Sequence, residues 1–196
     1  MVEVLERSKP APDGGVAPLL LPRTSMDLHE AKERIAIALV ESIFQRAGYG
    51  VRRLVADRPS SRRPALEEFT PSFCLSGAET CSPSGELPVV VAYRPFLEAH
   101  IALENQRRQS SVYTLARRQW PGLQLIIVTD HQPAGRSCFQ AIVAVNGGSD
   151  LRALNLVDLP GLALVPADVA EHEKLLVRMF ALLAGQQDPF ALARAV

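Results

Sequence analysis

The chain has 196 residues, of which 47% are hydrophobic, and its 21 lysines and arginines balance 21 aspartates and glutamates. This length suits one domain with a sizeable core. The balanced charge excludes a polycation that coats nucleic acid and an acidic chain that stays unfolded, so any nucleic-acid contact has to come from a local patch. Eighteen of the basic residues are arginine. Arginine favours phosphate and carboxylate partners, although a GC-rich genome produces the same bias.

The cysteines and histidines do not form a recognisable metal or disulfide pattern. Cys74, Cys81 and Cys138 are an odd number without C-x-x-C spacing, and the four histidines stand singly. Phosphate-binding glycine motifs and the H-E-x-x-H pattern of zinc peptidases are also missing. We therefore expect no metal and no cofactor. Neither a signal peptide nor a membrane-spanning run is expected, which favours a cytoplasmic setting without a membrane partner.

The amino-terminal third of the chain predicts an arm, a helix and a strand. Residues 1–24 mix proline, glycine and charge without periodicity, so we expect a flexible arm. A helix is expected over residues 27–46, because apolar residues recur there at helical spacing and Ser25 can cap its first turn. A short strand follows at 51–55.

The middle of the chain predicts further strands around a second long helix. A helix is expected at about 97–119, ended by Trp120-Pro121-Gly122. The strands are short apolar segments rich in β-branched residues. They are expected at 73–75, 87–93, 123–129 and 138–145.

The resulting order, α-β-β-β-α-β-β-α, predicts an α/β fold with a mixed central sheet flanked by helices. We assign residues 25–184 to this single domain. Pro166 marks the start of its closing helix. Residues 151–165 give no clear pattern, and residues 185–196 are expected to form a tail.

A helix that ends in Gly-Tyr-Gly-Val (48–51) before the first strand, together with this order, resembles the core of the restriction-endonuclease-like PD-(D/E)xK nucleases over roughly residues 26–145. In that family a Pro-Asp opens the second strand, and a Glu-x-Lys or Asp-x-Lys lies on the third. The resemblance implies a site in which two carboxylates hold Mg²⁺ and the lysine orients or activates the attacking water.

This sequence departs from the family at each charged position. Pro71-Ser72 opens the second strand, and Ala92-Tyr93-Arg94 lies on the third. A hydroxyl and a methyl group cannot neutralise a divalent ion, and Arg94 cannot release a proton near neutrality. We therefore expect Ser72, Ala92 and Arg94 to mark a degenerate, catalytically silent nuclease site. Ser72 and Arg94 are expected on neighbouring strands, open to the same end of the sheet.

The helix expected at 97–119 carries polar residues on its apolar face. At about 100° per residue, Asn105 and Arg108 share the face of the apolar residues. Some members of the family have Gln-x-x-x-Tyr on this helix, and Gln109 and Tyr113 match that spacing. Either the helix overhangs a polar cleft, or these groups are bonded internally, for example Glu104 with Arg108.

Two groups of arginines are candidates for binding phosphate. One group surrounds Arg52 and Arg53 on the first strand and its loop, and the other marks the long helix at Arg107 and Arg108. If both border one cleft, they can bind DNA or RNA with steep salt dependence. The alternative is that they are dispersed and paired with acidic residues.

Three functions remain open from the sequence. The first is a silent nuclease-fold domain that serves as a binding or structural subunit of a nucleic-acid-processing or mobile-element assembly. The second is a protein-interaction scaffold without a nucleic-acid role, whose partner is another protein or a second copy of the chain. The third is an active Mg²⁺ nuclease whose carboxylates have migrated to Glu67, Glu68 or Glu86.

Two other acidic positions favour structural roles. Glu41 is expected on the solvated side of the first helix. Asp130-His131 ends the fourth strand, where ligands gather in α/β sheets, but the sequence places no nucleophile beside the pair.

Overall fold

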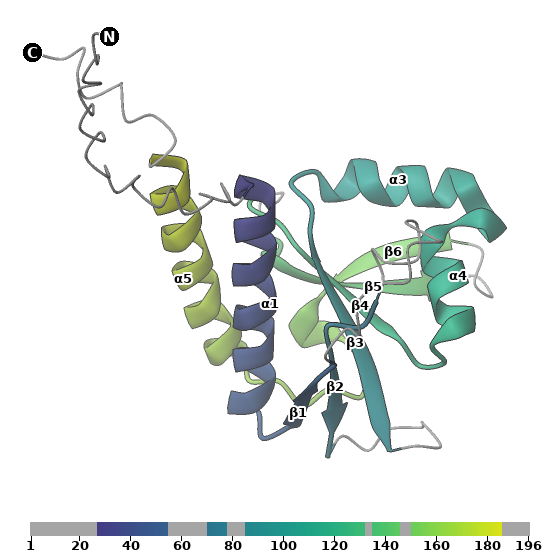
Figure 1. Cartoon of the computed structure of the whole chain (residues 1–196), viewed down its shortest axis with the longest axis horizontal. Coiled ribbons are helices and arrows are strands. Elements are labelled where there is room, and N and C mark those ends of the chain that lie inside the picture. The colour runs from purple at the N-terminus through teal and green to yellow at the C-terminus, as the bar shows by residue number, and fades with distance from the viewer. Residues whose placement is uncertain (1–26, 55–69, 78–84, 132–134, 146–149, 186–196) are drawn as a thin grey trace, which may run out of the picture.

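The computed structural model of the chain describes residues 27–54, 70–77, 85–131, 135–145 and 150–185. These residues form a six-stranded mixed sheet with helices on both faces, as Figure 1 shows. The predicted α/β class with a mixed, helix-flanked sheet is therefore confirmed. The expected arm at 1–24, Ser25 as an N-cap, and the tail beyond residue 185 lie outside the described residues.

The strands follow one another across the sheet in chain order. The first three are antiparallel: β1 (Gly50–Arg53), β2 (Phe73–Ser76) and β3 (Glu86–Tyr93). The fourth, β4 (Gln124–Val128), runs parallel to β3. The last two, β5 (Phe139–Val145) and β6 (Asp150–Asn155), are again antiparallel to their neighbours.

Two helices cover each face of the sheet. α1 (Leu28–Arg46) and α5 (Pro166–Gly185) lie side by side on one face, and α3 (Leu97–Arg107) and α4 (Val112–Gln119) cover the other (Figure 1). Side chains of β3 alternate between two apolar cores, because both faces of a central strand are buried. No helix in the described part of the chain is both long enough and apolar enough to cross a membrane.

The helix α1 begins one residue later than expected, at Leu28, and Asp27 caps it. The Asp27 carboxylate accepts a hydrogen bond from the His29 N–H at 3.3 Å. The carboxylate also opposes the positive end of the helix dipole. The glycine that follows the helix, Gly48, has a φ of +86°, a conformation that favours the end of a helix.

The prediction of one continuous helix over residues 97–119 is wrong. The chain leaves α3 through a short 3₁₀ turn, η1 (Arg108–Ser110), and then starts α4. The buried carboxylate of Glu104 accepts hydrogen bonds from the Ser111 hydroxyl at 2.8 Å and the Val112 N–H at 2.9 Å. Glu104, a residue of α3, therefore caps the amino-terminal end of α4, and these hydrogen bonds stabilise the break between the two helices.

Residue Arg108 has a φ of +48° and a ψ of −116° at this break. Such a backbone conformation is rare for a residue with a side chain. The helical-wheel expectation that placed Arg108 on the apolar face fails for the same reason, because the regular spacing stops at Arg107.

The segment without a clear sequence pattern contains β6 and a 3₁₀ turn, η3 (Leu156–Asp158). The side-chain amide of Asn105 on α3 bonds both backbone polar groups of one β6 residue, Leu151. Its amide nitrogen donates to the Leu151 carbonyl at 3.1 Å, and its oxygen accepts from the Leu151 N–H at 2.6 Å. The polar residue on the apolar face is therefore bonded internally, and it ties α3 to the edge strand.

We predict that Asn105→Ala lowers the free energy of unfolding by about 1–3 kcal/mol, because it leaves the Leu151 N–H and carbonyl without their side-chain partner. The measurement is urea denaturation followed by circular dichroism. Gln106→Ala, at the exposed neighbouring position, is the control and should leave the midpoint nearly unchanged. Equal midpoints for both variants would contradict this role for Asn105.

Candidate functional site

The strand pairing brings three strand ends to one edge of the sheet. β3 and β4 run parallel and both end there, whereas β5 runs antiparallel to β4 and begins there. Residues directly after β3 and β4 and directly before β5 therefore meet along this line, which we call the β3–β4 edge. Ligands commonly bind at the carboxyl ends of strands in α/β sheets.

The three positions that the nuclease resemblance singles out lie on two neighbouring strands, with Arg94 at the β3–β4 edge and Ser72 opposite Val90, four residues before it. Ser72 directly precedes β2 and Arg94 directly follows β3, the strand paired with it. The Ser72 N–H donates to the Val89 carbonyl at 2.7 Å, and the Arg94 N–H donates to the Val128 carbonyl at 3.0 Å, so both residues extend the sheet. Alternation along the strands assigns Ser72, Ala92 and Arg94 to the face that α3 and α4 cover.

The side chains at these positions do not fit a Mg²⁺ ion. The Ser72 hydroxyl accepts a hydrogen bond from the Val91 N–H at 3.2 Å, and Ala92 is only 1% exposed within the core. Mg²⁺ binds carboxylate oxygens, which none of the three positions supplies. Within the ranges described, no group of three or more histidine, cysteine, aspartate or glutamate side chains could hold a metal.

Arg94 brings a half-buried cation to this face of the edge. Burial lowers the pKa of its guanidinium group, and the negative charges of Glu33 and Glu104 act in the opposite direction. The guanidinium also donates to the Tyr93 carbonyl at 2.8 Å. Arginine does not release a proton near neutrality, so Arg94 stabilises negative charge but does not activate water.

The opposite face of the β3–β4 edge carries a hydrogen-bonded cluster of Lys32, Tyr93 and Asp130. The Lys32 ammonium group lies 2.6 Å from the Asp130 carboxylate and 3.0 Å from the Tyr93 hydroxyl. The hydroxyl in turn donates to Asp130 at 2.9 Å. The ring of Phe180 on α5 packs against the ammonium group at 4.9 Å, so the cluster joins α1, β3, β4 and α5.

The electrostatics of this cluster favour the ionised pair. Burial lowers the pKa of Lys32, but the hydrogen bonds to Asp130 and Tyr93 outweigh it, and the pKa is raised. Burial raises the pKa of Asp130, but hydrogen bonds from Lys32, His131 and Tyr93 leave it below its usual value. Both groups are therefore charged at neutral pH, and each stabilises the other.

The Lys32–Tyr93–Asp130 cluster has the properties of a structural connection. Three donors surround the Asp130 carboxylate, because the His131 ring nitrogen Nδ1 also lies 2.8 Å from it. A carboxylate with these partners is a poor general base. Sequence reasoning identified Asp130 and His131 but missed Lys32 and Tyr93, because the ammonium group lies on a helix 61 and 98 residues from its partners.

The arginines on β1 each bind a carboxylate. Arg52 contacts both oxygens of Glu86, at 3.2 and 2.6 Å, and the bond lowers the pKa of Glu86. Arg53 donates twice to Glu41, at 2.9 and 2.7 Å. Glu41 is buried, so the expectation of a solvated helix-face charge is wrong: the arginine of the neighbouring strand neutralises and covers it.

Glu86, one of the three expected positions for a migrated carboxylate, lies far from the β3–β4 edge. It is the first residue of β3, whereas Ala92 is next to the last, so the two lie near opposite ends of the strand. Six residues of strand span roughly 20 Å. The other two proposed migrated ligands, Glu67 and Glu68, lie outside the described residues.

The second group of candidate residues lies around the break between α3 and α4. Arg107 donates to the buried Glu104 carboxylate at 2.8 Å, so this arginine pairs with Glu104 in place of the expected Arg108. Gln109 lies in the η1 turn. Tyr113 is buried, and its hydroxyl donates to the Ile142 carbonyl at 3.1 Å.

The structure does not bring the two arginine groups into one cleft. Arg52 and Arg53 lie on β1 at one border of the sheet, whereas α3, which ends in Arg107, packs on β6 at the other border. Five strand spacings of about 4.8 Å give roughly 24 Å between those borders. The alternative of dispersed, carboxylate-paired arginines therefore describes Arg52, Arg53 and Arg107.

Comparisons with family models, with curated proteins and with solved structures find no match for this chain.

We predict that Asp130→Asn lowers the free energy of unfolding by about 1–3 kcal/mol, because it leaves a partly buried ammonium group without its anion. The matched control is Glu30→Gln, which breaks an exposed helical pair with Arg34 and should cost about 0.5 kcal/mol or less. Both are measured by urea denaturation at neutral pH.

The pH dependence gives an independent check. Since the pKa of Asp130 is lowered on folding, its contribution is present above its usual value, about pH 4, and is lost as the pH falls through the lower folded value. The raised pKa of Lys32 makes its contribution disappear only as the pH rises beyond about 10.5. An Asp130→Asn effect that is the same at pH 3 and at pH 7 would contradict the ion pair.

Proposed function

We propose that this chain is a catalytically silent domain of restriction-endonuclease-like architecture, which serves as a binding or structural subunit of a nucleic-acid-processing or mobile-element assembly. The observation that supports the proposal most strongly is that Ser72, Ala92 and Arg94 lie on two neighbouring strands and on one face of the sheet. The nuclease resemblance requires two carboxylates and a lysine at those positions.

The topology agrees with the order that the resemblance implies. A helix precedes three antiparallel strands, a helical connection follows, and the next strand pairs parallel to the third. A parallel pair requires such a crossover, and this one places α3 and α4 on the face opposite α1. The support is topological, and many unrelated functions can share one topology.

The chemistry of the edge supports a silent domain over an active one. The Ser72 hydroxyl is already bonded to the Val91 N–H, and the Ala92 methyl group belongs to the core. A glutamate at position 92 would bury its carboxylate among apolar side chains, which is costly without a partner. These positions therefore offer no carboxylate ligands for a metal ion, and the surrounding apolar core leaves no space for larger side chains.

A protein-interaction scaffold is the second candidate, and the pairing of the arginines favours it. Arg52, Arg53 and Arg107 all bind carboxylates of the chain itself, so each would have to exchange that partner for a phosphate. Large apolar side chains are also exposed on α5, namely Leu175, Val177 and Leu182. Leu175 and Leu182 are seven residues apart, so they lie on the same side of α5 and can both contact one protein partner.

We predict that fluorescently labelled DNA or RNA oligonucleotides bind the full chain at about 50 mM salt and much more weakly at about 200 mM salt. Arg108→Ala should flatten the slope of log K against log salt by roughly 0.7–0.9, since the Arg108 guanidinium is exposed and makes no bond within the part of the chain that the structure describes. Arg34→Ala is the control, because Arg34 already pairs with Glu30 on α1.

The same preparation is tested for cleavage of supercoiled plasmid with Mg²⁺ or Mn²⁺, and we expect no cleavage. Metal-dependent nicking activity that co-purifies with the protein would overturn the proposal of a catalytically silent domain. Absence of any nucleic-acid binding at the lower salt concentration would leave the scaffold as the function that the structure supports.

A further inference from the structure

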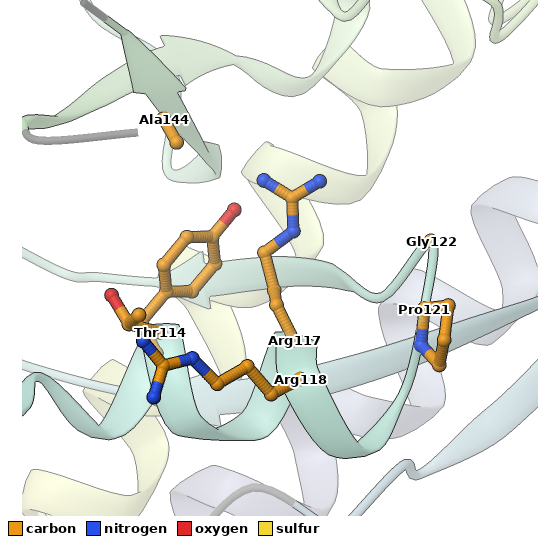
Figure 2. Close-up of a pocket in the computed structure, with 7 residues that line it drawn as sticks. Thr114, Arg117, Arg118, Pro121, Gly122 and Ala144 are labelled. Atoms are coloured by element: carbon orange, nitrogen blue, oxygen red, sulfur yellow. The ribbon is translucent and has the colours of Figure 1, made fainter. Parts of the chain in front are cut away.

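An open groove of about 410 Å³ lies along α4, at the opposite end of the sheet from the β3–β4 edge. Figure 2 shows this groove and its lining side chains. One wall is polar and comes from α4, with Thr114, Arg117 and Arg118. The remainder is apolar or backbone, from the Pro121-Gly122 turn before β4 and from Ala144 of β5. A volume of this size suits a small ligand.

The helix spacing places the polar groups of the groove in two neighbouring rows. Thr114 and Arg118 are four residues apart, so they lie above one another on the surface of α4, and the same holds for Tyr113 and Arg117. The Arg117 guanidinium carbon lies 5.7 Å from the centroid of the Tyr113 ring. Because the Tyr113 hydroxyl is bonded to the Ile142 carbonyl, that ring is fixed and holds the arginine above it.

The charge of this groove is not balanced by the described residues. Five other arginines, at positions 34, 46, 52, 53 and 107, each lie within 3.0 Å of a carboxylate. Arg117 and Arg118 form no such pair within the described ranges, and as consecutive helix residues they extend in different directions (Figure 2). The carboxyl end of the α4 dipole attracts one cation near the last turn but does not neutralise two.

We propose that the α4 groove binds the phosphate group of a small molecule of nucleotide size. Arg118 and the Thr114 hydroxyl, which lie one helical turn apart, donate to the phosphate oxygens, and Arg117 in the neighbouring row adds a second positive charge. Pro121 and Ala144 form an apolar wall against which the uncharged part of the ligand packs. Gly122 has no side chain, so its backbone forms an open part of that wall.

This inference does not depend on the nuclease-like proposal, because the groove lies at the end of the sheet where β4 begins, away from Ser72 and Arg94. The ligand is also distinct from a long nucleic acid. An arginine patch that follows a phosphate backbone is an extended surface, whereas this groove is short and bounded by the Pro121-Gly122 turn.

The test is titration of the isotope-labelled full chain with adenosine monophosphate, followed by amide NMR, with adenosine and inorganic phosphate as separate probes up to about 5 mM. We expect adenosine monophosphate to shift the amides of residues 113–122, and adenosine to bind at least tenfold more weakly. The double variant Arg117→Gln/Arg118→Gln should weaken binding of the monophosphate about tenfold or more. Arg178→Gln, which removes an exposed arginine from α5, is the matched control.

Four results would overturn the proposal: no shift with adenosine monophosphate, equal binding of adenosine, shifts confined to other elements, or full binding by the double variant. Binding of an oligonucleotide through these arginines, with no response to the monophosphate, would also overturn it and assign the groove to nucleic acid. Because the wild-type shifts locate the ligand without any substitution, a folding defect in the variant would not obscure the result.

Discussion

The parallel pairing of β3 with β4 is the constraint on which the rest of this structure depends. Parallel neighbours cannot be joined by a tight turn, so the chain has to cross over the sheet between them. The crossover supplies α3 and α4, which bury one face, and leaves α1 and α5 to bury the other. It also places the ends of β3 and β4 and the start of β5 on one line.

The two faces of that line differ in their chemistry. On the face below α3, Ser72 and Arg94 make backbone hydrogen bonds that extend the sheet, and Ala92 is part of the core. On the face below α1, Lys32 and Asp130 form an ion pair that joins elements far apart in the sequence. Both faces therefore use polar groups to hold the edge together. The Ser72 hydroxyl and the Asp130 carboxylate both bond to other groups of the chain.

Sequence patterns predicted most elements of the fold, because the signals for them are local. The apolar run over residues 87–93 and the helical spacing of 27–46 correspond to β3 and α1 within one residue at most boundaries. The break after Arg107 was not predictable in this way. It is stabilised by the Glu104 carboxylate of α3, which accepts hydrogen bonds from Ser111 and Val112 at the start of α4. β6 was missed because buried and exposed residues do not alternate cleanly along it. Its free backbone edge is bonded in part by the Asn105 side chain, which the sequence pattern does not reveal.

The candidate site was predictable only in part. The resemblance predicted from two short motifs that Ser72 and Arg94 lie on neighbouring strands, and the pairing of β2 with β3 agrees. The arginine–carboxylate pairs depend on residues brought together by the sheet and its helices. The central claim, that the β3–β4 edge is not a metal site, is tested most directly by adding Mn²⁺ to the labelled chain and following amide signals by NMR. We predict that the signals of Phe73, Val91 and Arg94 keep their intensity relative to the rest of the sheet. Selective loss of these three signals at low Mn²⁺ would place a metal at the edge and contradict the account.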